Sequence, residues 1–240
     1  MTRNLCAGED YGRPMELFTA TWSALRRAVH ALPEDAFAEP SGCRGWSVQD
    51  LVGHLVIDAQ DVLITLATPA DSAPTADALS YWTPTPTPPD GTDPHDALTV
   101  RLAAAYEDPG LLRAHLEDLG GAAERAAQLA HFETPVATQG MSLTVRDFLH
   151  AYVLEWTLHH LDLLAHLTPA QRVDAPPLLA DGLAEARDMV ERRLRLALPA
   201  TWSDADALRR ATGRLPLTDA QRAELEELGP RGRMLPLSFG

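Results

Sequence analysis

The sequence LHAYVLEWTLHHLD at residues 149–162 decides how the fold is interpreted, because it places ionisable side chains inside an apolar helical pattern. Glu155 and His159 are four residues apart, so a helix separates them by about 40° and puts both on one face, one turn apart. His160 lies about 140° from Glu155 and cannot share that face. A carboxylate and an imidazole in this arrangement can bind one metal ion, although the pair alone also fits an ordinary hydrogen bond on a helix face.

A second informative stretch, GWSVQDLVGHL, covers residues 45–55. Ser47 followed by Asp50 predicts a helix start at which the two residues cap each other, with aspartate in place of the more usual glutamate or glutamine. His54 lies seven residues after Ser47, two turns into an apolar helix. A histidine in that place is either packed in the core or used as a ligand, and this stretch alone leaves both interpretations open.

Helical patterns continue through most of the chain, whereas strand signals are few. Apolar residues recur with a period of 3.6 residues, and Pro33 and Pro169 each end a helix. The predicted helices cover residues 14–32, 47–66, 96–107, 111–132, 144–167 and 177–198, and the tail 202–240 contains two short helical patterns.

These patterns predict an all-α fold in two regions. Residues 1–168 form a helical bundle, and residues 169–240 form a helical C-terminal region packed on it. Between residues 68 and 96, repeated prolines exclude a helix interior. This long connection contains Tyr81 and Trp82, and it is either a surface loop anchored by the aromatic pair or a lid over a binding site.

The charge balance excludes several classes of protein. The 240 residues include 20 basic and 34 acidic side chains, for a net charge of −14, which argues against binding to nucleic acid or to an anionic membrane surface. No apolar run is long enough to cross a bilayer, and residues 1–10 contain no apolar signal region, so we expect a cytoplasmic protein. Its two cysteines, Cys6 and Cys43, cannot form a disulfide framework and are expected to be free thiols.

Two motifs give the chain a resemblance to a known family. Residues 43–55 read CRGWSVQDLVGHL and residues 155–163 read EWTLHHLDL, about 100 residues apart. Together they resemble the mycothiol-dependent maleylpyruvate isomerase N-terminal-like family, part of the DinB-like superfamily of metal-binding helical bundles. The resemblance covers about residues 13–168, and residues 211–218 are similar to the family's C-terminal region. It implies a DinB-like four-helix bundle with a helical C-terminal extension.

The resemblance also implies a metal triad of His54, Glu155 and His159. Two imidazoles and one carboxylate leave one open position on a tetrahedral ion. We expect a divalent metal, zinc by preference, although these donors also accept nickel, iron or manganese. Asp162, one turn after His159, is expected to orient that imidazole through its second ring nitrogen. His54 lies about 10 Å along the helix from its start at Ser47, and Cys43 comes before that start. Cys43 is therefore not expected to be a metal ligand.

The open position suits mycothiol or a similar low-molecular-weight thiol as cosubstrate, because zinc favours the thiolate. A thiolate can attack an electrophilic carbon, in S-transfer or as a transient step of isomerisation. We therefore expect an enzyme, a mycothiol-dependent S-transferase or isomerase. Arg214 is a candidate for binding a carboxylate of the substrate or of the thiol cofactor. The sequence contains arginine but no lysine, which is compatible with an actinobacterial source.

Two other functions stay open at this point. The first is a metal-dependent hydrolase whose open position holds hydroxide; it needs a general base, for which Asp162 and Asp58 are the candidates. The second is a non-catalytic metal-binding bundle, which a metal facing a closed apolar interior would favour. The expected partners are a small thiol and an electrophilic substrate, with neither nucleic acid nor membrane, and a homodimer is left open.

Overall fold

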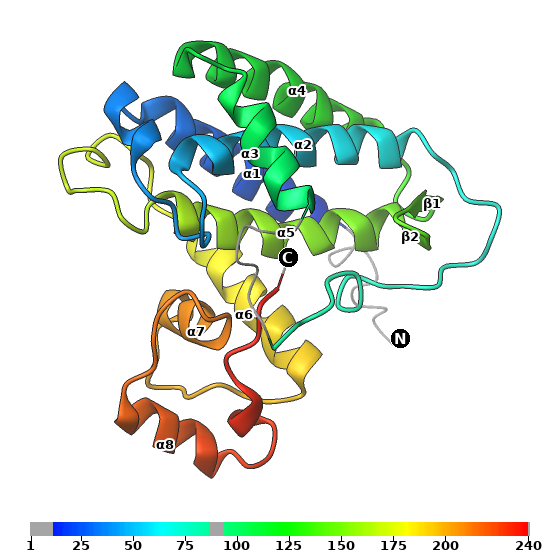
Figure 1. The fold of residues 1–240 in the computed structure, drawn as a ribbon. Coiled ribbons are helices and arrows are strands. Elements are labelled where there is room, and N and C mark those ends of the chain that lie inside the picture. The colour runs from blue at the N-terminus through cyan, green and yellow to red at the C-terminus, as the bar shows by residue number, and fades with distance from the viewer. Residues whose placement is uncertain (1–11, 87–93, 240) are drawn as a thin grey trace, which may run out of the picture.

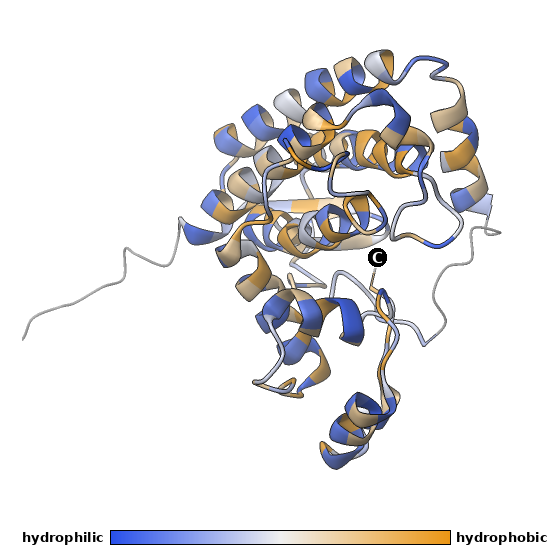
Figure 2. Cartoon of the chain, turned by 90° about the vertical axis from the view of Figure 1, so that its left-hand side faces the viewer, coloured by the Kyte–Doolittle hydropathy of each residue, from blue (hydrophilic) through white to orange (hydrophobic). Residues whose placement is uncertain are grey.

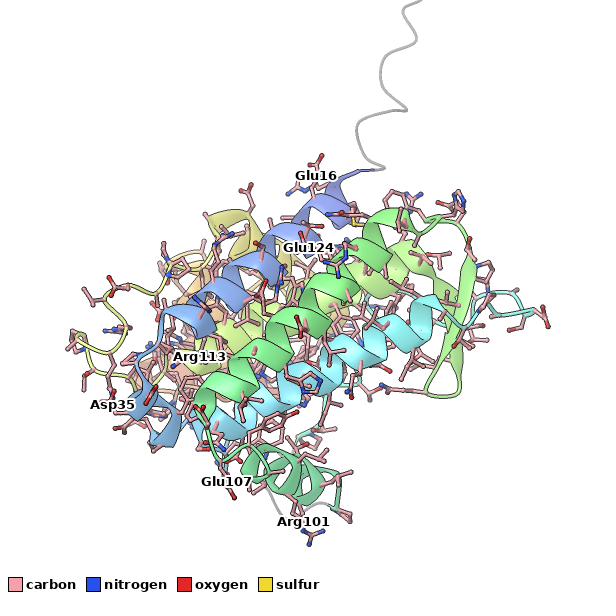
Figure 3. All side chains as sticks on the ribbon, turned by 90° about the horizontal axis from the view of Figure 1, so that it is seen from above. Glu16, Asp35, Arg101, Glu107, Arg113 and Glu124 are labelled. Carbon is pink, nitrogen blue, oxygen red and sulfur yellow. The ribbon has the colours of Figure 1, made fainter. Side chains whose placement is uncertain are left out.

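A computed structural model describes residues 12–86 and 94–239, and these form a mainly helical molecule (Figure 1). Four long helices make the bundle: α1 (Arg13–Ala31), α2 (Val48–Leu66), α4 (Pro109–Leu129) and α5 (Val145–Leu163). Seen from above, α1, α4 and α2 lie side by side with α5 beneath them (Figure 3). A short helix α3 (Pro94–Ala104) packs on α2, and a 3-10 turn η1 (Glu34–Ala38) follows α1. The predicted four-helix bundle is confirmed.

The central helix α5 is buried on every side from Ala151 to Leu163. Trp156 packs edge-on against Phe18 and Trp22 of α1, deep in the bundle core. Hydrophobic residues gather where the helices face one another (Figure 2). Ionisable side chains on α5 are therefore removed from water, and each must find a polar or charged partner inside the protein.

The two helices that carry the candidate ligands begin at the predicted caps. The Ser47 hydroxyl accepts a hydrogen bond from the Asp50 N–H, and the Asp50 carboxylate accepts one from the Ser47 N–H. Thr144 caps α5 in the same manner, its hydroxyl accepting from the Asp147 N–H. These caps satisfy free N–H groups and define where each of the two helices starts. The capping interpretation of Ser47 is confirmed.

A small hairpin between α4 and α5 is a short strand element within this mainly helical fold. Strands β1 (Pro135–Thr138) and β2 (Met141–Thr144) pair antiparallel, with Val136 opposite Leu143. Both turn residues, Gln139 and Gly140, have positive φ, the conformation that the type I′ turn of a two-residue hairpin requires. Four-residue strands are too short to show a clear alternation of apolar residues, so the sequence between the helices predicted to end at 132 and to begin at 144 shows no strand signal.

The C-terminal region builds a second apolar cluster against α5. It contains α6 (Ala180–Leu194), α7 (Asp204–Ala211), α8 (Asp219–Glu227) and a 3-10 turn η2 (Gly232–Met234). Leu154, Leu158 and Leu161 of α5 pack in this cluster with residues of α6 and α7 such as Met189 and Leu208. The helix α6 is shorter at both ends than the predicted 177–198 segment, and the two short helical patterns of the tail are α7 and α8. A domain boundary at residue 168 stays a prediction.

The described part of the proline-rich connection lies against α5. Tyr81 is buried and packs against Phe148, while the Trp82 indole N–H donates to the Ala151 carbonyl. The aromatic pair therefore anchors this loop. Residues 87–93, which belong to the same connection, and Cys6 lie outside the described residues. Within the described residues, no helix is both long and apolar enough to span a membrane.

Candidate metal centre

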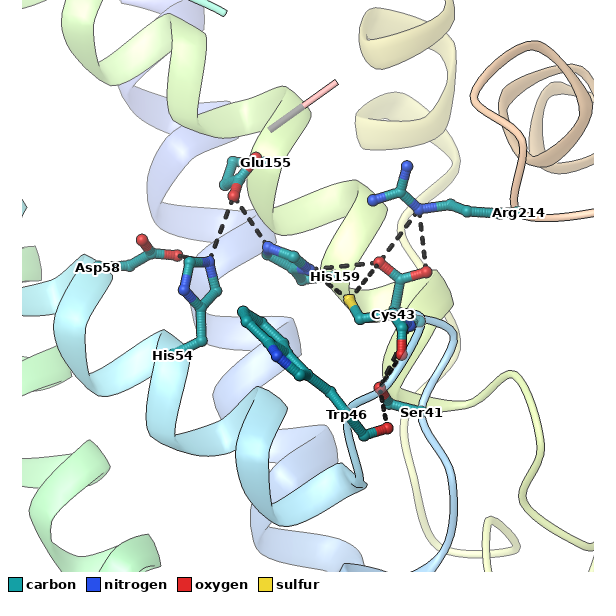
Figure 4. A network of polar contacts seen from close by, with 9 residues as sticks. Ser41, Cys43, Trp46, His54, Asp58, Glu155, His159 and Arg214 are labelled. Atoms are coloured by element: carbon teal, nitrogen blue, oxygen red, sulfur yellow. Dashed lines mark hydrogen bonds and ion pairs between the residues drawn. The ribbon is translucent and has the colours of Figure 1, made fainter. Parts of the chain in front are cut away.

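Four side chains that could bind a metal ion, two from α2 and two from α5, come together (Figure 4). His54 and Asp58 lie one turn apart on α2, and Glu155 and His159 lie one turn apart on α5. The Oε1 atom of Glu155 is 3.5 Å from His54 Nε2 and 2.8 Å from His159 Nε2. One donor atom from each of the four side chains lies within 4.8 Å of the others. The structure thus brings together all three side chains of the predicted triad and adds Asp58.

The imidazole of His159 has a different partner on each side. Its Nε2 faces Glu155, whereas its Nδ1 lies 3.3 Å from the Asp162 carboxylate and 3.7 Å from the Cys43 sulfur. A carboxylate at Nδ1 orients the ring and leaves Nε2 directed at the donor group. Asp162 therefore lies on the far side of the candidate ligand, next to the second ring nitrogen of His159.

Arg214 holds Asp162 in turn. Its Nε donates to both carboxylate oxygens, at 2.9 and 3.1 Å, although the two residues are 52 positions apart in the chain. Burial raises the pKa of Asp162, but the Arg214 guanidinium and the hydrogen bond with His159 outweigh it and lower that pKa to about 2. The Asp162 carboxylate is therefore charged at neutral pH and acts as a fixed acceptor for His159.

The charges within the donor group favour a cation. Burial opposes charge on Glu155, but His159 and His54 outweigh it and lower the Glu155 pKa. Burial also lowers the pKa of His159, but Glu155 and Asp162 together raise it well above its usual value. The pKa of the Asp58 carboxylate is raised to about 6, chiefly by burial. Two imidazoles and two carboxylates gathered in this way fit a divalent metal ion, which would replace the proton on His159.

The donor group lines a cavity of about 920 Å³. Besides the four donors, its walls include Cys43, Trp46, Trp82, Tyr152 and Arg214. The exposed side chains of Arg44 and His166 also line the cavity, so the site is reached from the surface. The site therefore does not face the closed apolar interior that would favour a purely structural metal.

Two features of the site were not anticipated from the sequence. Cys43 is not expected from the sequence to be a ligand, yet the loop that carries it folds back so that its sulfur lies 3.3 Å from Asp162. Asp58 was considered only as a base for hydrolysis, although its spacing from His54 repeats the four-residue spacing of Glu155 and His159. That spacing was the signal available in the sequence. The neighbouring His160 lines a separate small cavity, next to Thr21 of α1. Burial lowers the pKa of His160 to about 4.

Gly42 explains how the Cys43 loop comes so close to α5. Its N–H donates to the Asp162 carbonyl at 2.8 Å, and a Cβ on residue 42 would lie 2.7 Å from the Asp162 Cα and closer still to one carboxylate oxygen. Only glycine fits this contact without movement of the backbone.

We therefore expect Gly42→Ala to lower the free energy of unfolding by about 1–3 kcal/mol, as overpacking does, in urea denaturation. Gly121→Ala in α4 is the matched control, because its new methyl would meet only the ends of two arginine side chains. This control should be neutral or stabilising by up to about 1 kcal/mol. Equal stability of the two variants would show that the contact with Asp162 does not constrain residue 42.

The bundle and the donor group together define a class, a helical-bundle protein with a candidate divalent-metal centre. A model of the family described as "Mycothiol maleylpyruvate isomerase N-terminal domain" matches residues 18–164, more than half of the chain. The protein belongs to this family. The resemblance drawn from the segments 43–55 and 155–163 is thereby confirmed.

A solved structure is also similar to this chain. It is described as "YfiT from Bacillus subtilis is a probable metal-dependent hydrolase with an unusual four-helix bundle topology". Its sequence is 18% identical, the TM-score is 0.42, and the similarity covers 69% of this chain and 90% of the other. No curated protein matched the chain.

Proposed function

We propose that this protein is a metal-dependent enzyme that activates a low-molecular-weight thiol, such as mycothiol, for transfer to an electrophile or for thiol-assisted isomerisation. Zinc is the expected metal, and the cytoplasm is the expected location. The observation that carries the proposal is that His54, Glu155 and His159 line a cavity of about 920 Å³ that is reached from the surface. The chain also belongs to the family of the mycothiol maleylpyruvate isomerase N-terminal domain.

The thiol of Cys43, which lines the cavity, is unsuited to be the nucleophile. Burial, together with the nearby Asp162 carboxylate, raises the pKa of Cys43 above its ordinary value. Cys43 therefore stays protonated near neutral pH, and a protonated thiol is a poor nucleophile. Among the described residues, Cys43 therefore does not supply the reacting thiol, and the proposal takes that thiol from a cosubstrate that enters the cavity.

A divalent cation at this site supplies a positive charge that lowers the pKa of a thiol bound to it. The chain's residues hold that charge in place: His54, Glu155 and His159 bind, and Asp162 fixes the ring of His159. In transfer, a sulfur–carbon bond forms while the bond to the leaving group breaks, and the thiol proton passes to solvent. In isomerisation the sulfur–carbon bond forms and later breaks, so the thiol is recovered.

Arg214 is the candidate anchor for an anionic group of either substrate. The hydrogen bonds of Arg214 within the described residues are those that its Nε donates to Asp162, so the two terminal nitrogens of the guanidinium are left for a substrate. Arg214 also lines the cavity. A carboxylate bound by these nitrogens would lie next to the metal centre and could be held by paired hydrogen bonds.

Titration of the cobalt-substituted protein with mycothiol tests this function. We expect the visible spectrum of the bound cobalt to change in proportion to the thiol added, because sulfur enters the coordination sphere. The same thiol with its sulfur methylated is the control and should leave the spectrum unchanged. An unchanged spectrum at millimolar mycothiol would reject thiol activation and leave the metal site standing.

A metal-dependent hydrolase is the second candidate, and Asp58 is the observation in its favour. Hydrolysis needs a base near the metal, and Asp58 is a buried carboxylate of the donor group with a pKa of about 6. Ester or amide hydrolysis by the zinc-loaded protein, with no spectral response to thiol, would favour this function over the first.

A further inference from the structure

Asp58 has no assigned role in the triad, yet it belongs to the donor group. It lies on α2 one turn after His54, and it is 7% exposed. Its Oδ2 is 3.4 Å from His54 Nε2. A buried carboxylate in contact with a metal-binding imidazole can have one of two roles. It can bind the same metal ion as the imidazole, or it can accept a hydrogen bond from the ring nitrogen that does not bind the metal.

The nitrogen that Asp58 faces decides between these roles. A supporting carboxylate bonds the ring nitrogen that points away from the metal, as Asp162 does with Nδ1 of His159. Asp58 instead faces Nε2 of His54, the same nitrogen that lies 3.5 Å from Glu155. Asp58 is therefore on the inner side of the ring, together with the other donor atoms.

The separations between the donor atoms also suit a ligand. Donors about 2.0–2.2 Å from a tetrahedral ion lie about 3.3–3.6 Å from one another. The two distances at His54 Nε2, 3.4 Å to Asp58 and 3.5 Å to Glu155, fall within that range. The 2.8 Å between Glu155 and His159 Nε2 is shorter, because these two atoms share a hydrogen bond that a metal would replace. Two carboxylates also balance the two charges of a divalent cation, whereas the triad alone leaves one charge uncompensated in a buried place.

We propose that Asp58 is a fourth protein ligand, so that the resting site holds its metal through two imidazoles and two carboxylates. The position that the triad leaves open is then occupied by Asp58, and a thiol reaches the metal by displacing this carboxylate. Asp58 thereby controls access to the metal. The displacement step rests on the proposed function, whereas the ligand assignment rests only on the donor geometry.

The two parts of the proposal predict opposite changes in one variant. Asp58→Asn should bind metal at least about 100-fold more weakly in a chelator competition, because loss even of a supporting partner costs about 10–100-fold. In the cobalt-loaded variant, mycothiol should perturb the spectrum at a lower concentration than in the wild type, because the competing carboxylate is gone. A merely structural role for Asp58 would weaken both affinities together.

Asp61→Asn is the matched control. Asp61 is three residues further along α2, lines the same cavity and accepts a hydrogen bond from the Tyr152 hydroxyl. Its substitution removes the same charge from the same helix, so it should leave metal affinity unchanged. Equal losses of metal affinity in the two variants would mean that any lost negative charge on α2 weakens metal binding. That result would overturn the assignment of Asp58 as a ligand.

A crystal structure of the metal-loaded wild type gives a second test that does not depend on the variant folding. We expect an Asp58 oxygen about 2.0–2.2 Å from the metal, as for other carboxylate ligands. A metal held by His54, Glu155 and His159 with Asp58 out of contact would overturn the ligand assignment and leave the proposed function intact. Metal ligation by Asp58 without any spectral response to thiol would uphold the assignment and reject thiol activation.

Discussion

Glu155→Gln is expected to lose at least about 100-fold in metal affinity, one of the two largest effects that the structure predicts. The Glu155 carboxylate contacts both His54 and His159, so it joins the ligands of α2 to those of α5. Glutamine has nearly the same shape and lacks the charge, so the bundle should keep its helix content. Elemental analysis after dialysis, followed by chelator competition, measures the loss, and His54→Ala and His159→Ala should show it as well.

Glu185→Gln is the control for this prediction. Glu185 of α6 pairs with His150 of α5 at 2.8 Å, another glutamate–histidine contact on the same central helix but outside the donor group. Its substitution should leave the metal content at that of the wild type. A full complement of metal in both Glu155→Gln and His54→Ala would reject the triad, whatever the fold of the protein.

The relative placement of the candidate ligands on each helix was predictable because local geometry fixes it. Four-residue spacing places Glu155 above His159 on any α-helix, and the cap at Ser47 sets where His54 lies on the next one. That these two helices meet was a different kind of prediction. It came from the family resemblance of two motifs, because no periodicity in the sequence says which helix faces of the bundle come into contact.

The remaining parts of the site depend on contacts between distant segments, which the sequence does not show. The Cys43 loop returns to α5 through the backbone bond of Gly42 and the close approach of residues 42 and 162. Arg214 reaches Asp162 because the C-terminal region packs on α5 through an apolar cluster. In each case an ordinary turn or charged residue gains its role only from tertiary packing.

Asp162→Ala is expected to lower the free energy of unfolding by about 3–5 kcal/mol. Asp162 is 1% exposed and is the partner of the largely buried Arg214 guanidinium, so its removal leaves a positive charge without compensation. Urea denaturation measures the loss. The double variant Asp162→Leu, Arg214→Met should recover much of it, because two apolar side chains of similar size replace the pair.

The same carboxylate makes stability depend on pH in acid. The pKa of Asp162 is about 2 in the folded protein and 3.8 in its ordinary state, so the unfolded chain binds the proton more readily. The stability that Asp162 contributes is therefore complete above about pH 5 and is lost as pH falls towards 2, a loss of about 2 kcal/mol. The double variant should show a correspondingly smaller decrease in stability over this range.

The double variant also separates the stability of the fold from the orientation of His159. Although its stability recovers, its metal affinity should stay about 10–100-fold below that of the wild type, because Nδ1 of His159 has lost its acceptor. Chelator competition on the refolded, stable double variant measures this. Wild-type affinity in that variant would mean that Asp162 serves only to neutralise Arg214. Recovered stability with weakened binding would instead show that the Arg214–Asp162–His159 chain of contacts positions a metal ligand.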